Sequence, residues 1–424
     1  MQIKSFVALS ALSAIALAAN NSTLTTATPS VKSACKFDDF TATASADVAS
    51  VAACATAVGD ITIEGDEFGT IELTGVEAIY GNLHIQNATQ ASAFNAATLQ
   101  LVSGELSLDA NTILASLNLA QLTTVGSFSL TALPALEVIG LTSGITSAES
   151  VIISDTGLNT LEGINVVQLK TFNVNNNDQI QLIDSGLQKV TDTLSISFNA
   201  DSVDVKLDQL SEAKDVYLQS ISSFSAANLT KVTGSLSFVS NSIEKIEISS
   251  LKSVSNSLTV SKNSDLEEIE FANLTSIGGA LVISENDDLS TFAGFPELAK
   301  VGGSVSINGS FDNGTFESLE SVSGGFNLRS TGDLTCEEFN ELNSDGDIKG
   351  DKYYCSGANT ETSSSSSKSG NANGVSTSSA DDEDSSSSSS SSDSTTTTKD
   401  SSASAPGGFI ALLAGAAAIG LSLY

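Results

Sequence analysis

The sequence predicts an all-β fold, a parallel β-solenoid of about 13 coils with about 22 residues in each coil. The main observation is a short phrase in which a small or turn-forming residue precedes alternating apolar and polar residues. The phrase is clearest in segments 234–238, 256–260, 279–283 and 303–307. Alternation with a period of two indicates a strand with one buried face. Recurrence at a fixed interval of roughly 20 to 50 residues is typical of a solenoid.

Each repeat contains three apolar strips, numbered here in chain order. The first strip is the alternating phrase, the second is represented by Ile246 and Ile248, and the third by Leu251 and Val254. Turns between the strips would fold each repeat into a roughly triangular coil. Stacking at about 4.8 Å per coil would give a rod about 60 Å long. Glycines often follow the third strip, and we expect them to supply a positive φ at a tight corner.

The segments before the repeats predict secretion. Residues 1–19 combine Lys4, an apolar run and small residues at Ala16-Leu-Ala18, which is the arrangement of a cleavable signal peptide. A membrane-spanning helix is the alternative, but about 14 apolar residues are too few for a hydrocarbon core of about 30 Å. Residues 20–34 predict a short disordered lead, and residues 35–57 predict a helix-compatible, disulfide-closed cap.

The segments after the repeats predict attachment to a surface. The repeats fill residues 58–334, and residues 335–358 form a second cap. The Ser/Thr-rich residues 359–405 predict an O-glycosylated stalk, with a bare flexible linker as the alternative. Residues 406–424 form the end of a GPI-anchor signal, in which small residues, a polar spacer and an apolar tail follow one another.

A short membrane-spanning tail is the alternative to the GPI signal, but the apolar stretch is weak and short for that role. On the GPI interpretation the tail is removed and a lipid is attached to a small residue before the spacer. The candidate attachment residues are Asp400, Ser401 and Ser402.

The four cysteines predict two local disulfides, one in each cap. An even number suits a secreted chain, although four cysteines allow three connectivities. Cα atoms of bridged cysteines lie within about 7 Å of each other, so no bridge can join the two ends of a rod about 60 Å long. If the rod forms, the bridges are Cys35–Cys54 and Cys336–Cys355.

Composition excludes several classes of function. The formal net charge is −33, from 50 acidic and 17 basic residues. This charge disfavours nucleic acid and anionic lipid surfaces, which attract Lys and Arg. The chain has no Trp, and His84 is its only histidine. We expect no catalytic residue, no cofactor and no metal ion.

Five sequons predict N-glycosylation. Two of them share a place in their coils, because a leucine separates Asn from Thr in Asn228-Leu-Thr230 and in Asn273-Leu-Thr275. If the leucine points inward, Asn and Thr point outward. The predicted N-glycosylation sites are Asn87, Asn228, Asn273, Asn308 and Asn313.

Two polar clusters have a functional and a structural interpretation. Residues 173–177 with Asp178 could bind a metal ion or a glycan, but such asparagines more often fill turns or stack in ladders along a solenoid. Residues 343–351 faintly resemble a calcium loop but lack its bidentate Glu, so a plain turn is favoured.

A polysaccharide-cleaving enzyme is a third possibility, because that chemistry needs two carboxylates, one with a raised pKa. The candidates are Glu244 with Glu247 and Glu267 with Glu270. They flank apolar strip residues in the manner of a solvated face, and no convergent catalytic group accompanies them.

The ordered combination of parts resembles the fungal GPI-anchored cell-wall-organisation proteins of the sporulation-specific and extracellular-mutant type. Their ectodomain is built like the receptor L domain. The resemblance covers nearly the whole chain and is carried by a signal peptide, two cysteine caps, a Ser/Thr tail with a GPI signal, and phrases such as Gly234-Ser-Leu-Ser-Phe238.

This resemblance implies a right-handed β-solenoid of leucine-rich character at the plasma membrane, the wall or both. Lys399 stands alone where a dibasic pair would favour membrane retention, so both places stay open. We predict a non-enzymatic surface glycoprotein that maintains wall organisation by binding wall polysaccharides or wall proteins, held by a GPI lipid. The alternative is a surface receptor or adhesin with a protein ligand, because a fold does not fix a function. No nucleic-acid partner is expected.

Overall fold

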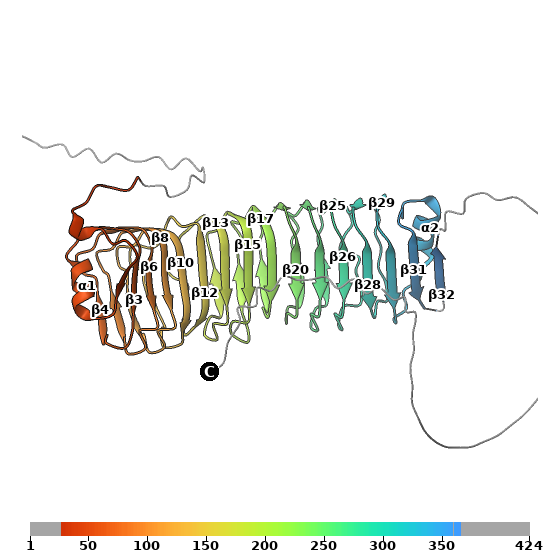
Figure 1. The fold of residues 1–424 in the computed structure, drawn as a ribbon. Coiled ribbons are helices and arrows are strands. Elements are labelled where there is room, and N and C mark those ends of the chain that lie inside the picture. Colours follow the sequence, from red (N-terminus) through yellow and green to blue (C-terminus); the bar gives the residue numbers. More distant parts are fainter. Residues whose placement is uncertain (1–26, 359, 366–424) are drawn as a thin grey trace, which may run out of the picture. The chain divides into compact units, whose positions relative to one another are not determined.

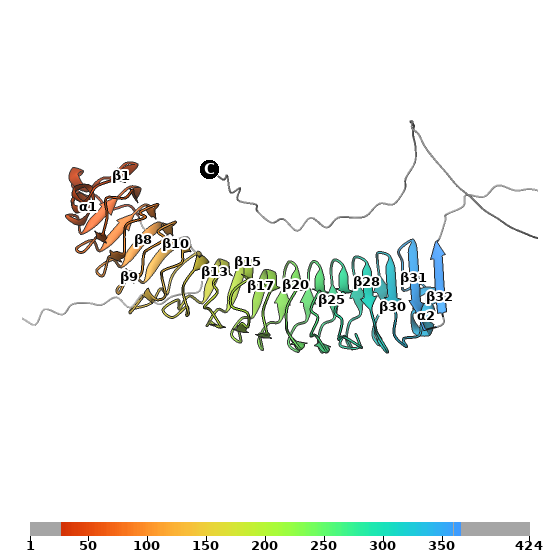
Figure 2. The ribbon, with the colours of Figure 1, turned by 90° about the horizontal axis from the view of Figure 1, so that it is seen from below.

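The computed structural model describes residues 27–358 and 360–365, which form a parallel β-solenoid (Figure 1). The fold-class prediction is confirmed, with about 13 turns. The chain divides into two units, Met1–Lys368 and Ser369–Tyr424, and every described residue belongs to the first. The coils of this unit stack along a curved axis (Figure 2).

Several predicted segments lie outside the described residues. These are the signal peptide (1–19), the first part of the lead (20–26), almost all of the stalk (359 and 366–405), the tail (406–424) and the candidate attachment residues Asp400, Ser401 and Ser402.

Strands of the first strip form one long parallel ladder. Each strand pairs in register with the strand one coil earlier and one coil later, as β23 does with β20 and β26. These strands are β1 (Phe40–Ala42), β3 (Ile61–Glu64), β6 (Leu83–Gln86), β12 (Ser150–Thr156), β20 (Leu236–Val239), β23 (Leu258–Ser261), β26 (Leu281–Ser284), β28 (Val305–Gly309), β30 (Phe326–Ser330) and β31 (Lys352–Gly357).

The third strip joins the same sheet, because it leads directly into the first strip of the next coil. Its separate strands are β2 (Thr56–Val58), β5 (Ala78–Tyr80), β19 (Lys231–Val232), β22 (Ser253–Val254), β25 (Ser276–Ile277), β27 (Lys300–Val301) and β29 (Ser321–Val322). In other coils the two strips merge into one long strand, in β8 (Leu101–Asp109), β10 (Thr124–Leu133), β13 (Gln168–Asn175), β15 (Lys189–Ser197) and β17 (Glu212–Gln219).

The second strip forms three separate small sheets instead of one ladder. The first holds β4 (Thr70–Glu72), β7 (Ala93–Asn95), β9 (Ser116–Asn118) and β11 (Ile139–Gly140). The second holds β14 (Leu182–Asp184), β16 (Asp204–Lys206) and β18 (Ser223–Ser225), and the third holds β21 (Lys245–Glu247) and β24 (Glu268–Glu270).

Inward side chains of all three strips form one continuous core. In a first-strip strand such as β23, Leu258 and Val260 are fully buried, while Thr259 and Ser261 are partly exposed. This is the alternation that the sequence predicted. Aromatic rings fill the later coils, where Phe271 and Phe295 stack with centroids 5.2 Å apart. A long apolar core of this kind is the main favourable contribution to folding.

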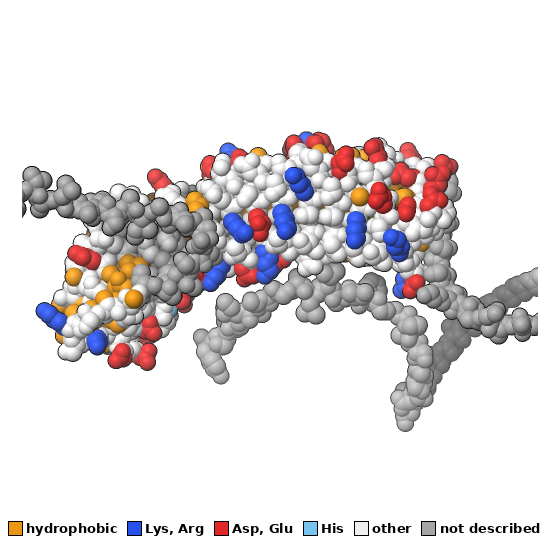
Figure 3. All heavy atoms as spheres, turned by 90° about the horizontal axis from the view of Figure 1, so that it is seen from above, with side chains coloured by type: hydrophobic (Ala, Val, Ile, Leu, Met, Phe, Trp, Pro, Cys, Tyr) orange, Lys and Arg blue, Asp and Glu red, His pale blue; other side chains and the backbone are white. Residues whose placement is uncertain are grey.

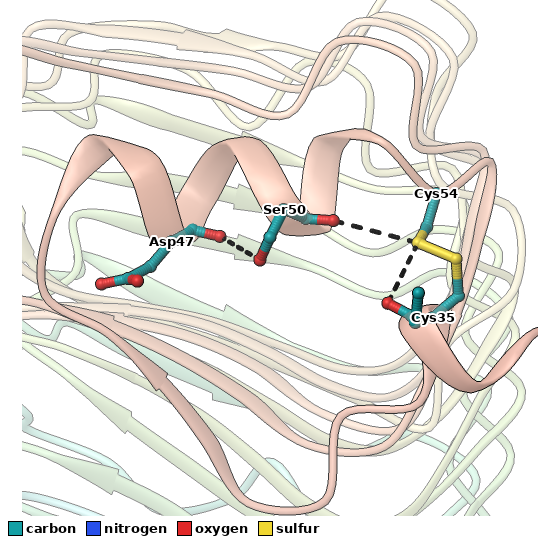
Figure 4. Close-up of a disulfide and its surroundings, with 5 residues drawn as sticks. Cys35, Asp47, Ser50 and Cys54 are labelled. Atoms are coloured by element: carbon teal, nitrogen blue, oxygen red, sulfur yellow. Dashed lines mark hydrogen bonds between the residues drawn. A yellow bond between two sulfur atoms is a disulfide. The ribbon is translucent and has the colours of Figure 1, made fainter.

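The N-terminal cap combines a disulfide with two helical segments (Figure 4). The bridge Cys35–Cys54, with Cα atoms 5.8 Å apart, joins the 3-10 helix η1 (Ser33–Cys35) to the residues after helix α1 (Ser45–Ala52). At the start of α1, the Asp47 carboxylate accepts hydrogen bonds from the N–H groups of Thr43 (3.2 Å) and Ala44 (3.1 Å). A carboxylate at the third helical position that accepts from the backbone N–H of the N-cap residue Ala44 stabilises the start of the helix.

The C-terminal cap continues the solenoid and then closes its edge. Helix α2 (Glu337–Asp345) begins beside Cys336, which is bridged to Cys355 in β31. Strand β32 (Thr360–Ser365) pairs antiparallel with β31, so the last parallel strand has a partner on its outer side. Sheet strands therefore extend beyond both ends of the predicted repeat range 58–334, and each cap adds a short helix to the all-β fold.

One corner of the coil is held by non-glycine residues in the left-handed backbone region. Among the described residues, eleven non-glycine residues have positive φ, between 50° and 59°. Most of them directly follow the outward residue that ends the first strip, as Lys262 follows Ser261. Asparagine or a small residue often comes next. Left-handed backbone at such residues is uncommon, so the surrounding structure must hold it.

An asparagine ladder supplies that support. The Asn263 side-chain oxygen accepts hydrogen bonds from the backbone N–H (3.0 Å) and the side-chain amide (2.9 Å) of Asn241. The Asn263 amide in turn donates to Asn286 Oδ1 (3.0 Å) and to the carbonyl of Phe238 (3.2 Å). Asn177 and Asn199 form a similar pair earlier in the chain, and Ile221 occupies the equivalent position in the coil between Asn199 and Asn241. All of these asparagine side chains are buried and fully paired.

The predicted role of the corner glycines is wrong for most of them. Gly59 and Gly81 have positive φ, but Gly104, Gly126 and Gly303 do not. A side chain would not fit at these positions, because the backbones of adjacent coils approach closely at this corner. A Cβ atom on Gly303 would lie 2.7 Å from the carbonyl carbon of Gly279. Glycine is therefore required here by contact between coils rather than by backbone conformation.

We predict that Asn263→Leu destabilises the solenoid, because it leaves the buried N–H of Asn241 without its acceptor. The free energy of unfolding should fall by about 1–3 kcal/mol. Urea denaturation measures this loss, with the outward variant Thr259→Ala as the control that should stay close to the parent protein. Equal stability of Asn263→Leu and the parent would contradict a structural role for the ladder.

We predict that Gly303→Ala also destabilises the solenoid, by about 1–3 kcal/mol, because the added methyl group overlaps the adjacent backbone. The matched control is Gly186→Ala, since a Cβ atom at Gly186 has no atom within 4 Å. Thermal unfolding of the two variants should separate them. A lower midpoint for Gly186→Ala than for Gly303→Ala would show that contact between coils is not the reason for the glycine.

Candidate functional site

Outward side chains of the first strip form two columns that cross the coils. Register pairs link each member to the next, for example Ser237 to Thr259 and Thr259 to Val282. From β10 to β28 one column holds Ser129, Ile152, Asn173, Ser195, Tyr217, Ser237, Thr259, Val282 and Ser306. The other holds Thr131, Ser154, Asn175, Ser197, Gln219, Val239, Ser261, Ser284 and Asn308.

Neither column contains a charged residue, and we call these residues the uncharged face. This is unexpected in a chain with 50 acidic residues. Charges return at both ends of the second column, with Asp109 in β8 and Arg329 in β30. The Arg329 guanidinium lies 4.8 Å from the centre of the Tyr354 ring. The uncharged face is therefore a surface of hydroxyl, amide and aliphatic groups.

Hydrogen bonds within the uncharged face link neighbouring side chains. The Ser154 hydroxyl donates to Asn175 Oδ1 (2.7 Å), and the Asn175 amide donates to Asn173 Oδ1 (2.8 Å). The Tyr217 hydroxyl donates to Gln219, and burial raises the pKa of Tyr217, so the phenol stays neutral. Such a surface offers donors, acceptors and C–H groups to a ligand, but no carboxylate, imidazole or amine.

The second strip carries the opposite chemistry. Glu247 and Glu270 are register partners, and Lys245 lies between them, 3.0 Å from one carboxylate and 3.2 Å from the other. The hydrogen bond from Lys245 holds the pKa of Glu247 below its usual range. A glycosidase acid needs a raised pKa. These glutamates, together with the exposed Glu244 and Glu267, form a solvated, ion-paired face.

Lysines gather on the third strip. In Figure 3, basic side chains lie along the middle of the solenoid, and acidic side chains gather toward one margin. Lys189, Glu212 and Lys231 occupy successive positions of one column, and Lys300 lies further along it. Lys189 pairs with Glu212 at 3.2 Å, a typical weak surface ion pair.

The predicted sequon asparagines are all exposed. Leu229 and Leu274, which separate Asn from Thr in two sequons, are fully buried. Asn308 ends the uncharged face at β28, whereas Asn87 lies at the left-handed corner with a φ of 51°. The structure therefore spreads the sequons over several surfaces instead of gathering them in one.

The asparagine cluster at 173–177 divides between two roles. Asn177 is part of the buried ladder, and Asn173 and Asn175 belong to the uncharged face. Asn176 and Asp178 line a groove of about 690 Å³ at the left-handed corner. Sequence reasoning did not single out Phe198, which lies in the same groove and is 52% exposed. Its only sequence signal was an aromatic residue just beyond the end of a first-strip phrase.

Neither metal binding nor membrane crossing has structural support among the described residues. In that part of the chain, no group of three or more His, Cys, Asp or Glu residues could hold a metal ion. The segment that faintly resembled a calcium loop is the end of α2 followed by Gly346, which has a positive φ of 84°. No helix in the described ranges is long and apolar enough to span a bilayer.

Comparison with known proteins finds relatives over most of the chain. The chain is 37% identical over 361 residues to the cell surface GPI-anchored protein ECM33 of Candida albicans, which covers 84% of this chain and 85% of that protein. It is 34% identical to the cell wall mannoprotein PST1 of Saccharomyces cerevisiae, over 76% of this chain and 72% of that protein. It is 31% identical to protein ecm33 of Aspergillus fumigatus, over 76% and 80%.

No protein-family model matches the chain. No solved structure matches it significantly.

We predict that Lys245→Met raises the pKa of Glu247 toward its ordinary value, because the hydrogen bond from Lys245 is the largest cause of the lowered pKa. Carboxyl chemical shifts followed by NMR during an acid titration measure the change. Lys252→Met removes another exposed lysine and should leave the pKa of Glu247 where it is. An unchanged pKa in Lys245→Met would rule out the described ion pair.

Proposed function

Because the chain belongs to the family of fungal GPI-anchored cell-wall proteins that includes ECM33 and PST1, we propose that it organises the wall by binding neutral wall polysaccharide. Its place is the cell surface, at the outer face of the plasma membrane and in the cell wall. The proposed binding surface is the uncharged face. Maintenance of wall integrity would then follow from direct contact between the solenoid and the polymer.

The absence of charge from this face is the observation that carries the proposal. A polysaccharide without charge presents hydroxyl groups and C–H surfaces. A charged protein side chain buried against such a polymer would lose its hydration without gaining a counter-ion, which is costly. Hydroxyl and amide groups can instead exchange water for sugar hydroxyls at little cost. The second and third strips of this acidic chain carry ion pairs, whereas the uncharged face offers only neutral groups to a ligand.

The length of the face favours a polymer over a small ligand. Nine coils separated by about 4.8 Å extend over roughly 40 Å. Each coil presents a similar pair of side chains, so successive sugars would meet similar groups. Many weak contacts along one chain can give strong retention, because later contacts form at high effective concentration. Extended faces of solenoids are commonly used in this way.

The remaining features fit a surface glycoprotein without catalysis. The ion-paired glutamates of the second strip do not provide a glycosidase acid, which supports a non-enzymatic role. We propose N-glycans at the exposed sequons Asn87, Asn228, Asn273, Asn308 and Asn313. A glycan on Asn308 would bound the uncharged face at one end. We propose GPI attachment at Asp400, Ser401 or Ser402, on the sequence pattern alone.

We predict that the secreted unit ending at Lys368 is retained on insoluble β-glucan, chitin or mannan in a saturable way. The double variant Ser237→Asp/Ser261→Asp places two carboxylates on the uncharged face. Its retention should fall on the order of tenfold or more, because the carboxylates lose hydration on binding. Sedimentation of the protein with each polymer measures the retained fraction.

The matched control is Ser253→Asp/Ser276→Asp, which adds the same charges to third-strip positions of comparable exposure. Retention that falls equally in both double variants would show a general effect of charge. If the parent protein is retained on none of the polymers, the proposal is wrong, and a receptor or adhesin with a protein ligand becomes the better function.

A further inference from the structure

Phe198 occupies a position that is unusual for an aromatic residue. It has a φ of 51° and its side chain is 52% exposed. The corresponding corner positions of other coils hold small or polar residues, among them Ala110, Ala132 and Ser220. Left-handed backbone recurs at this corner of the coils, but Phe198 is the only aromatic residue among the eleven described non-glycine residues with positive φ. Neither core packing nor turn chemistry explains an exposed phenyl ring here.

The groove around Phe198 is otherwise polar. It has a volume of about 690 Å³ and extends over several coils at the left-handed corner. Asp155 and Asp178, which precede Phe198 in the chain, line it together with Asp201, Ser240 and Lys262, which follow Phe198. A single exposed aromatic ring among hydroxyl and carboxylate groups gives the groove one apolar surface and many hydrogen-bonding groups.

The floor of the groove is held by hydrogen bonds, whereas its carboxylates have none within the described part of the chain. Asn199 and Asn241 lie in the floor, and their amides are already committed to the ladder. The carboxylates of Asp155, Asp178 and Asp201 form no ion pair or hydrogen bond with any other residue among the described ranges. A ligand hydroxyl could donate to them without breaking an existing contact.

We infer that this groove is a binding subsite for a single pyranose ring, which stacks on Phe198 and donates hydroxyl hydrogen bonds to the surrounding carboxylates. A pyranose ring has an apolar C–H face and a rim of hydroxyl groups, so it matches both surfaces of the groove. Three aspartates against Lys262 leave the lining negative, which disfavours a phosphorylated or carboxylated sugar. The ligand class is therefore an uncharged sugar at a chain end or branch.

The groove is continuous with the uncharged face. Phe198 directly follows Ser197, and Asn176 directly follows Asn175, the outward residues of the second column. A polymer lying on the face could thus place a branch or an end in the groove. The inference deepens the proposed binding of wall polysaccharide and takes its ligand class from that proposal.

The test measures two kinds of binding by the purified full-length protein in detergent. One is the affinity for soluble, fluorescently labelled oligosaccharides of β-glucan, chitin and mannan, followed by anisotropy. The other is retention on the corresponding insoluble polymers. Phe198→Ala should weaken binding of one oligosaccharide by about tenfold, since ring stacking and apolar contact are lost. Phe198→Tyr should keep the affinity, because the ring remains.

Two features keep the test independent of folding. Ala110 and Ala132 already adopt the same left-handed corner conformation, so Phe198→Ala should fold. Glu285→Ala changes the corner residue of a coil outside the groove and should leave oligosaccharide affinity unchanged.

The double variant Asp178→Asn/Asp201→Asn keeps side-chain size. Like Phe198→Ala, it should weaken oligosaccharide binding.

The outcomes separate the subsite from the proposed function. Weak oligosaccharide binding by Phe198→Ala together with intact binding by Glu285→Ala would support the subsite. If Phe198→Ala binds oligosaccharides as the parent does, the subsite is wrong, while retention on polymer through the uncharged face can still hold. If the parent protein binds neither oligosaccharide nor polymer, both proposals fail. Preference for a glucosamine oligosaccharide with free amines, lost at high salt, would overturn the assignment to an uncharged sugar.

Discussion

In-register stacking of the coils is the constraint on which this structure depends. Each first-strip strand inside the stack exchanges backbone hydrogen bonds with the coil before it and the coil after it, so a shift by one residue would turn the buried face outward. At the corner, the asparagine ladder adds side-chain hydrogen bonds that pass from Asn241 to Asn263 and on to Asn286. The close approach of backbones at Gly279 and Gly303 depends on the same register.

Stacking also determines which residues lie side by side on the surface. Residues about 22 positions apart become neighbours, so each outward position of the coil becomes a column with its own chemistry. Glutamates and lysines alternate on the second and third strips, where opposite charges offset part of the repulsion within a chain of net charge −33. Two outward columns of the first strip are free of charge over nine coils. This member of a family located at the cell surface therefore has one long outward face without charged side chains.

The ends of the stack need separate solutions, because an open strand edge invites pairing with another chain. Helix α1 and its disulfide cover one end, and β32 pairs with the last parallel strand at the other. Both bridges are local to their caps, so neither constrains the spacing of the coils between them. The caps keep the stack finite, and the faces of the coils stay available for contact.

Period and alternation in the sequence were sufficient to predict the solenoid, its three strips and the burial of residues such as Leu229 and Leu274. These properties are local, because a residue in a strand faces inward or outward according to its immediate neighbours. The sequence also favoured a turn or ladder role for the asparagines at 173–177, and Asn177 is a buried member of such a ladder.

Tertiary structure alone decided what depends on contacts between coils. Coil lengths vary, so the sequence did not fix which residues share a column, and neither the uncharged face nor the pairing of Lys245 with Glu247 could be read from it. The corner glycines are required because the backbone of the adjacent coil lies too close for a Cβ atom, and this contact cannot be predicted from the sequence. Phe198 became recognisable only when folding placed it, exposed and left-handed, between residues more than twenty positions away on either side.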